Sequence, residues 1–477
     1  MAVFDFFRRA LNSMIPKSNI EKQLNISIAT SAVMERGVDL WSRMYENNPP
    51  WIGGSDAVIP LNLPAAISEE MARLALTEFK IELTGNGRAT YMNKQLKANL
   101  INLKEHMELY CAKGGICLKP YVSAGGTIDI DFTQADRFFP TSYTSNKEIT
   151  GAVFLDSKRK GEYVYTRLEY HNLSGTDYTI INKAFRSEKL TSQSMDDDYI
   201  SVQYPYSTPV SLSEVEEWAS LSEDPVTINN IERPLFVYIK VPRANNLDTY
   251  SPLGTSVYSR AVDIIEQADK QFSRILWEYR ATEAAVHASE DIFDSDKNGK
   301  PILPSGRERL YRAFDFEGTQ SFLKEYAPAI RSDPMFKGLN KYFQLIEFTV
   351  GLSFGTISDP QEIEKTAEEI KASKQRSYAV VTGIQAAWDT GFDSLIYAMD
   401  VLCTLYNLAP AGIVEKAVSW GDGILEDSDK EYQRRWAMVV SGKYKIEKFY
   451  AWYFGCSEEE AKDMIPDAQA GNYPPEE

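Results

Sequence analysis

The sequence has few of the residues from which disulfide frameworks, metal centres and nucleotide sites are built. Its 477 residues include 4 cysteines and 3 histidines, and no cysteines stand as C-x-x-C. Such sparse cysteines exclude a disulfide-stapled secreted scaffold and favour a reducing compartment. No segment matches G-x-x-x-x-G-K-[ST], because Pro301 follows Gly299–Lys300 and Tyr444 follows Gly442–Lys443. We therefore expect no nucleotide hydrolysis by this chain.

Long apolar runs and an excess of positive charge are also missing. No apolar run approaches the roughly 20 residues that cross a bilayer. Asp5, Arg8 and Arg9 interrupt the aromatic start of the chain, so we expect neither a transmembrane helix nor a secretion signal. The 51 Lys and Arg are outnumbered by 68 Asp and Glu, which gives a net charge of -17. Proteins that grip nucleic acid cluster basic residues against its phosphates, so tight static DNA binding by a broad basic surface is not expected.

What is present is the composition of a folded protein with several subregions. Hydrophobic residues make up 43% and aromatic residues 12% of the chain, which excludes global disorder, and its length exceeds what one core supports. Apolar residues recur every three or four positions from Ser68 to Leu109, which predicts two amphipathic helices. Alternation from Ile116 to Phe185 predicts an antiparallel sheet. The polar stretch Ser187–Asn230, with a short helix after the capping box Ser211-x-x-Glu214, reads as a surface excursion.

Helical patterns dominate the second half of the chain. One apolar stripe from Ala261 to Tyr279 predicts a helix near residues 256–283, roughly 40 Å long at about 1.5 Å per residue. A β-like segment at Ala285–Phe293 and a turn at Asp294–Gly299 then form a small insert. Helical periodicity resumes at Leu339–Phe348. The insert is therefore predicted to lie between two helices.

An uncharged segment, residues 349–358, separates the second of these helices from the next. Its members are Thr349, Val350, Gly351, Leu352, Ser353, Phe354, Gly355, Thr356, Ile357 and Ser358. Asp359 at the N-cap predicts the start of a helix that runs to about Leu408. Short helices with capping boxes at Ser428 and Ser457, and a stop at Gly442, are expected beyond it.

Within the uncharged segment, Gly351–Gly355 matches the nucleophile motif G-x-S-x-G. That motif needs a strand before the serine, a helix after it, and an Asp and a His further along the chain. Here a helical pattern precedes Ser353. All the histidines, His106, His171 and His287, lie upstream. The hydrolase interpretation therefore fails on order and context, and a flexible apolar loop is favoured.

Three other groups of residues resemble metal sites only superficially. Residues Asp294–Gly299 match the start of a calcium loop, but position 12 is not a glutamate, so a tight turn is favoured. His106, Cys111 and Cys117 fit no common zinc spacing and are better explained as core residues. The acidic run at residues 196–198 is better explained as a solvated loop. We expect no metal and no cofactor.

Six stretches of the sequence carry a resemblance to a known family. They are Leu40–Trp51, Cys111–Tyr121, Gln134–Pro140, Ser251–Asp263, Ile346–Arg376 and Asp422–Trp436. Together they make the chain resemble, essentially from end to end, the portal proteins of long-tailed phages and prophages of Gram-positive bacteria.

The resemblance implies an α+β portal fold with an α/β wing that contains an antiparallel sheet, long stem helices, a small α/β clip and a helical crown. It implies these parts: 1–250, the N-terminal part of the wing; 251–283, a stem helix; 284–333, the clip; 334–348, the second stem helix; 349–358, the tunnel loop; 359–408, the long wing helix; and 409–477, a helical crown with the C-terminal tail. The crown is shorter than is usual for the family.

The resemblance also implies a function without enzymatic activity. It implies a ring, typically of twelve copies, at a vertex of the virion capsid, assembled in the host bacterial cytoplasm. The implied ring is the channel for double-stranded DNA and is used in genome packaging, head-tail joining and DNA ejection. The implied partners are the terminase large subunit, a head-completion or adaptor protein at the clip, and the major capsid and scaffolding proteins, with no membrane. An acidic or neutral wall suits a sliding polyanion, and an uncharged collar can touch DNA without reading its bases. Two alternatives stay open: a metal-dependent nuclease, and a capsid-associated adaptor or scaffold protein without a DNA channel.

Overall fold

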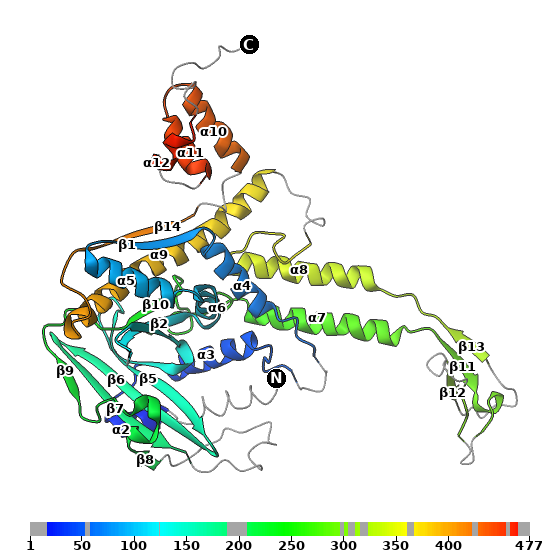
Figure 1. The fold of residues 1–477 in the computed structure, drawn as a ribbon. Coiled ribbons are helices and arrows are strands. Elements are labelled where there is room, and N and C mark those ends of the chain that lie inside the picture. Colours follow the sequence, from blue (N-terminus) through cyan, green and yellow to red (C-terminus); the bar gives the residue numbers. More distant parts are fainter. Residues whose placement is uncertain are drawn as a thin grey trace.

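The computed structural model describes most of the chain. The described residues are 17–52, 58–123, 125–187, 208–295, 300–303, 311–314, 323–359, 367–421, 428–454 and 458–465. Figure 1 shows a central body, a pair of helices that projects from it and ends in a small sheet, and a separate group of C-terminal helices. This mixture of helices and antiparallel sheets confirms the predicted α+β class.

The body is built around one large hydrophobic core. Its helices are α2 (Lys17–Leu24), α3 (Ala32–Tyr45), α4 (Leu63–Ala75), α5 (Gly87–Asn99), α6 (Leu103–Lys113) and α9 (Ala367–Leu405). Helices α3, α4, α5, α6 and α9 surround a sheet of order β10-β2-β3, formed by β2 (Gly115–Val122), β3 (Ile128–Gln134) and β10 (Val237–Lys240), whereas Ile20 of α2 belongs to a separate, smaller core. The aromatic side chains of Trp41, Tyr110 and Trp388 are at most 1% exposed. Among the described helices, none combines the length and apolarity needed to traverse a lipid bilayer.

A six-stranded sheet forms the other side of the body and confirms the predicted antiparallel pairing. It consists of β4 (Phe138–Tyr143), β5 (Ile149–Lys160), β6 (Tyr163–Ser174), β7 (Asp177–Arg186), β8 (Thr208–Val210) and, beside β7, β9 (Val226–Ile228). The predicted turn before Asp177 is there, with Gly175 at φ +62°. After Ser211 the chain forms only a 3₁₀ turn, Leu212–Glu214, in place of the expected short helix.

The prediction of two helices between residues 68 and 109 is wrong, because the chain makes α4, α5, α6 and a strand there. Strand β1 (Phe79–Gly85) pairs along its whole length with β14 (Val414–Trp420), in a region where only helices were expected. The ring of Phe79 packs 4.5 Å from that of Trp420. A partner so distant in sequence leaves no trace in the local pattern of either segment.

The projecting pair consists of α7 (Val262–Ala281) and α8 (Ser332–Val350), which pack side by side (Figure 1). At their far end lies a three-stranded sheet, in which β11 (Ala285–Ser289) pairs with β12 (Tyr311–Phe314) and β13 (Leu323–Tyr326). Across the base of this sheet, both carboxylate oxygens of Glu278 accept hydrogen bonds from the Arg331 guanidinium at 2.9 Å. The small insert between two helices is confirmed.

Helix α7 begins at Val262, six residues later than predicted. The Val257 N–H donates to the carbonyl of Cys111 at the end of α6 (3.0 Å), and the Ser256 hydroxyl donates to the same oxygen (3.4 Å). Because this backbone is committed to a tertiary contact, it does not enter the helix. The 20 helical residues span about 30 Å at 1.5 Å per residue, shorter than the expected 40 Å.

Helix α9 crosses the body and leads to β14 and then to the C-terminal helices α10 (Ser428–Val440), α11 (Ile446–Phe454) and α12 (Glu458–Asp463). Arg88, 5% exposed, holds the end of α9: its guanidinium donates to Asp400 Oδ1 (2.8 Å) and to the carbonyls of Ala409 (2.8 Å) and Pro410 (2.9 Å). The predicted stop at Gly442 is confirmed, with φ +71°. The predicted helix start at 360–362 and the box at Ser457 lie outside the described residues.

Candidate functional site

The structure divides the uncharged segment 349–358 between a helix end and a loop. Thr349 and Val350 form the last turn of α8, which the sequence was expected to end at Phe348. Gly351 closes the helix in the left-handed conformation, with φ +89°. A Cβ at this position would be strained and would also approach Val380 Cγ2 to 2.7 Å. Gly351 is therefore needed for the fixed left-handed backbone at the end of α8, whereas the sequence suggested that this glycine serves the mobility of the loop.

The loop that follows is organised by a carboxylate that sequence reasoning missed. Glu347, in the last turn of α8, is 0% exposed. Its Oε1 accepts hydrogen bonds from the N–H groups of Ile357 (2.6 Å) and Ser358 (2.9 Å). Its Oε2 accepts from the Ser358 hydroxyl (2.8 Å) and the Gly355 N–H (3.3 Å). In the sequence Glu347 looks like any helical glutamate, so no local signal would have identified it.

Two further side chains hold the ends of this loop. At its start, the Arg243 guanidinium donates to the carbonyl of Val350 and to that of Val257, both at 2.7 Å. Burial, with a smaller effect of Arg260, lowers the pKa of Arg243. At its end, Asn340 Oδ1 accepts the Asp359 N–H at 2.8 Å. The loop is thus fastened at both ends to the body and to α8.

Only part of the predicted segment reaches the surface. Val350, Leu352 and Ser358 are at most 3% exposed, Ser353, Phe354, Gly355 and Ile357 are half-buried, and Thr356 is exposed. The Thr356 hydroxyl donates to the carbonyl of Ser353 (2.6 Å), which closes a turn. We call residues 353–356 the loop tip. Within the single chain, the exposed part of the segment is centred on this tip.

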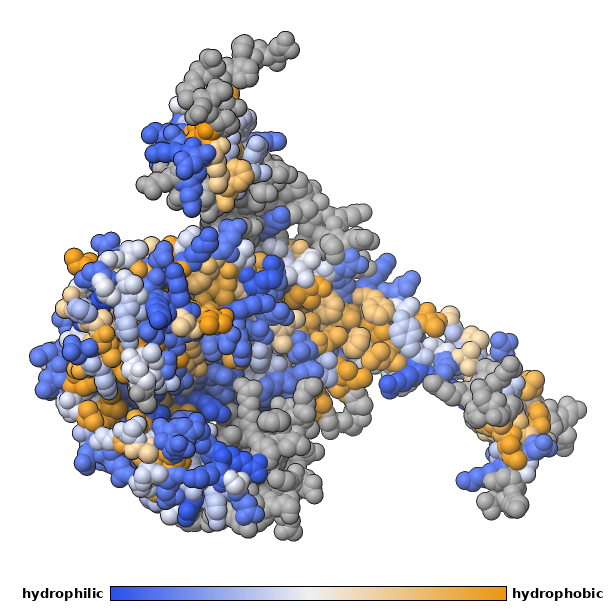
Figure 2. Space-filling model, in the orientation of Figure 1, coloured by the Kyte–Doolittle hydropathy of each residue, from blue (hydrophilic) through white to orange (hydrophobic). Residues whose placement is uncertain are grey.

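Beside the loop, the paired helices expose large apolar side chains. Figure 2 shows hydrophobic residues gathered along this projection. Five of them form what we call the apolar face: Trp277 (65% exposed), Tyr279 (42%), Phe336 (43%), Leu345 (44%) and Phe348 (55%). Large apolar side chains exposed on more than one side of a projecting helix pair mark an interaction site, because leaving them in water is unfavourable.

The enzyme and metal interpretations find no support in the described geometry. Ser353 follows helix α8, so the strand that a nucleophile elbow requires is not there. Cys111 and Cys117 are fully buried, which raises the pKa of both thiols, and His106 stacks on Phe132 at 3.9 Å. The described residues hold no group of three His, Cys, Asp or Glu that could bind a metal ion. Residues 196–198 and 296–299 lie outside the described ranges.

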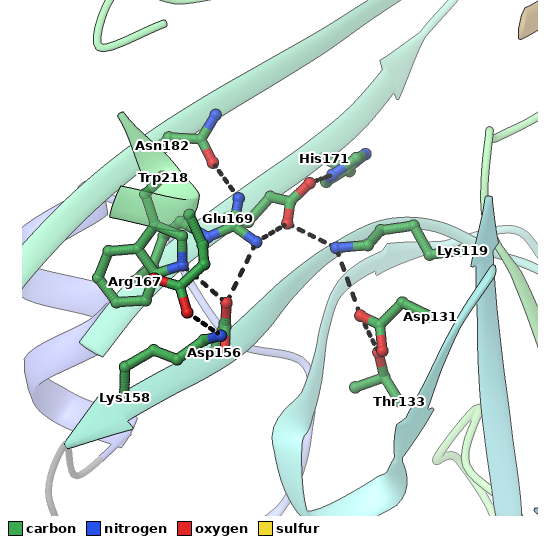
Figure 3. Close-up of polar contacts among 11 residues, drawn as sticks. Lys119, Asp131, Thr133, Asp156, Lys158, Arg167, Glu169, His171, Asn182 and Trp218 are labelled. Atoms are coloured by element: carbon green, nitrogen blue, oxygen red, sulfur yellow. Dashed lines mark hydrogen bonds and ion pairs between the residues drawn. The ribbon is translucent and has the colours of Figure 1, made fainter. Parts of the chain in front are cut away.

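A buried ionic cluster, also missed from the sequence, joins the two sheets of the body (Figure 3). Lys119 of β2, 5% exposed, donates to Glu169 Oε2 of β6 at 2.5 Å, and Arg167 lies 3.0 Å from the same oxygen. Burial alone would raise the pKa of Glu169, but Lys119, with His171 and Arg167, holds it well below its ordinary value. Burial lowers the pKa of His171. The imidazole lies 2.8 Å from Glu169 Oε1 and 2.7 Å from the Tyr178 hydroxyl, whereas Arg167 Nε is buried without a hydrogen-bond partner among the described residues. Because its contacts join the two sheets, the cluster has a structural role.

Comparison with known proteins places this architecture in a family. A family model described as phage portal protein, SPP1 Gp6-like, matches residues 43–463. The matched range includes both large sheets, the paired helices, the loop and α9. No curated protein matches the chain. Because the family model covers most of the sequence, the chain belongs to the SPP1 Gp6-like family of phage portal proteins.

Proposed function

We propose that this chain assembles into a ring, of about twelve copies, that forms the DNA channel at one capsid vertex of a long-tailed phage or prophage of Gram-positive bacteria. The family is structural and its members form oligomeric rings within virions, which supports the general role. The observation in this molecule that carries the proposal is the apolar face of α7 and α8. Copies of the same chain, arranged about an axis, would cover that face on each neighbour.

In this proposal the parts of the chain take the roles expected from the resemblance. The paired helices form the stem, and the sheet β12-β11-β13 at their far end forms the clip. Residues 1–250 form most of the wing, α9 returns through it, and residues 409–477 form the crown. Residues 349–358 form the tunnel loop, with the tip at 353–356 facing the lumen. The net charge of -17 supports a wall along which DNA phosphates slide without being held.

The proposed partners supply the roles for which the sequence has no motif. No phosphate-binding motif exists in the sequence, so a separate terminase ATPase would drive packaging. A head-completion or adaptor protein would bind the clip after packaging, and the major capsid and scaffolding proteins would contact the wing. The particle would be assembled in the bacterial cytoplasm, and DNA would pass without sequence-specific contacts.

The test is the assembly state of the purified protein. We expect negative-stain images to show rings with a central hole of roughly duplex width, about 20 Å or more. Trp277→Asp and Leu345→Asp place charges in the apolar face and should abolish the rings while the monomers stay folded by circular dichroism. Ile101→Asp, at a side chain 81% exposed in the body, is the matched control and should leave rings intact. Rings without an opening would favour the adaptor interpretation, and unaffected rings in both stem variants would refute the role of this face.

A further inference from the structure

The contacts of Glu347 suggest a specific role for this residue within the proposed tunnel loop. A carboxylate that is 0% exposed is costly unless its charge is compensated. Among the described residues, its compensation comes from the loop alone: three N–H groups and one hydroxyl between Gly355 and Ser358. The loop donors are satisfied by Glu347 in turn. Carboxylate and loop therefore stabilise one another, and each loses its partners if the other moves.

The backbone of Glu347 extends this control to the other end of the loop. Its carbonyl accepts the N–H groups of Gly351 and Leu352, both at 2.9 Å. One residue thus bonds the chain where it leaves α8 and again where it returns. Between these two sets of bonds lie Ser353 and Phe354, both half-buried, and the exposed Thr356 follows Gly355. The position of the tip is consequently determined by Glu347 more than by any residue of the tip itself.

We infer that Glu347 is a positioning residue for the tunnel loop, whose carboxylate holds residues 355–358 against the end of α8 and sets how far the tip extends. The inference rests on the proposed function, because only a ring gives the tip a channel to extend into. The loop has two discrete arrangements in this scheme. It is either closed on the carboxylate or released, with the carboxylate exposed to water or left unpaired.

Electrostatics favours the closed arrangement while DNA occupies the channel. Release would uncover one negative charge per subunit, in the same ring that DNA phosphates pass. Like charges at such close quarters repel, and the repulsion is strongest where water is excluded. Passing DNA would therefore discourage release, and the tips would keep a common height around the ring.

Hydrogen–deuterium exchange on purified rings tests the anchor. In Glu347→Gln the side chain loses its charge and one of its two acceptor oxygens, so the donors that face the new amide nitrogen lose their partner and the remaining bonds are weaker. At least one of the amides of Gly355, Ile357 and Ser358 should therefore exchange at least tenfold faster than in the native protein. Amides in the middle of α9 should not change. Asp333→Asn, an exposed charge removal in the first turn of the same helix, is the matched control and should leave the loop amides unchanged.

A milder variant covers the case in which Glu347→Gln fails to assemble. Ser358→Ala removes the hydroxyl that bonds Glu347 Oε2 and that also accepts the Gly355 N–H at 3.2 Å, and should accelerate exchange of Gly355 alone. Unchanged exchange in both variants would overturn the anchor, whatever happens to packaging. DNA packaged per particle is the second readout and should fall in Glu347→Gln while rings persist. Faster exchange with full packaging would uphold the anchor and instead refute the assignment of this loop to the DNA channel.

Discussion

The ionic cluster of the body allows one stability prediction to be developed in detail. In Glu169→Gln the carboxylate that binds Lys119 at 2.5 Å and Arg167 at 3.0 Å becomes neutral. Breaking a buried pair from one side costs about 3–5 kcal/mol, because the remaining charge stays buried without compensation. Here Asp131 lies 3.6 Å from Lys119 and Asp156 lies 3.6 Å from Arg167. These partly exposed acids offset some of the loss, so we expect the lower end, about 3 kcal/mol.

Urea unfolding followed by far-ultraviolet circular dichroism provides the assay, because the 8 tryptophans of the chain would all contribute to a fluorescence signal. With a slope of about 3 kcal/mol per M, the midpoint should fall by about 1 M. The double variant Lys119→Met with Glu169→Leu removes both charges and should recover most of this loss. A shift below about 0.2 M in Glu169→Gln, or no recovery in the double variant, would refute the reasoning.

The same cluster predicts a dependence on pH whose sign follows from the lowered pKa of Glu169. A carboxyl whose folded pKa is depressed stabilises the fold at every pH above its unfolded value, about 4.3. That contribution is lost as the pH falls through the lower folded pKa. The difference in unfolding free energy between the native protein and Glu169→Gln should therefore be constant from pH 7 to about pH 5 and should shrink in more acidic solution.

Two further substitutions test contacts elsewhere in the chain. Gly355→Pro removes an N–H that bonds Glu347 and requires a negative φ where Gly355 has φ +88°; it should reduce DNA packaging while rings still form, and normal packaging would count against the tunnel loop. Arg88→Met should destabilise the protein by about 2 kcal/mol, because the buried carbonyl of Ala409 loses its donor and the exposed Pro410 loses a hydrogen bond. Thermal unfolding measures this loss, with the exposed Arg36→Met as control, and a change below about 1 kcal/mol would contradict it.

Features that depend on neighbours in sequence were predictable. The antiparallel strands between residues 116 and 185 follow from alternation and from the turn at Gly175, although the structure divides them between two sheets where the sequence suggested one. The stop after α10 follows from Gly442. The insert between two helices follows from a change of period from 3.6 to 2. The rejection of a nucleophile at Ser353 needed only the order of residues along the chain. In each case the physical cause acts within a few positions, where side-chain period and backbone preference operate.

Features that depend on distant partners were decided by the tertiary structure. Strand β1 was mistaken for helix because its partner β14 begins more than three hundred residues later, and α7 starts late because Val257 bonds the end of α6. Glu347 and Glu169 read as ordinary charged residues. Their burial, and the donors that make it tolerable, arise only when separate segments converge. The sequence alone determined the periods, the turns and the family, whereas the pairing of buried charges required the folded chain, because the free energy of a charge is set by what surrounds it in space.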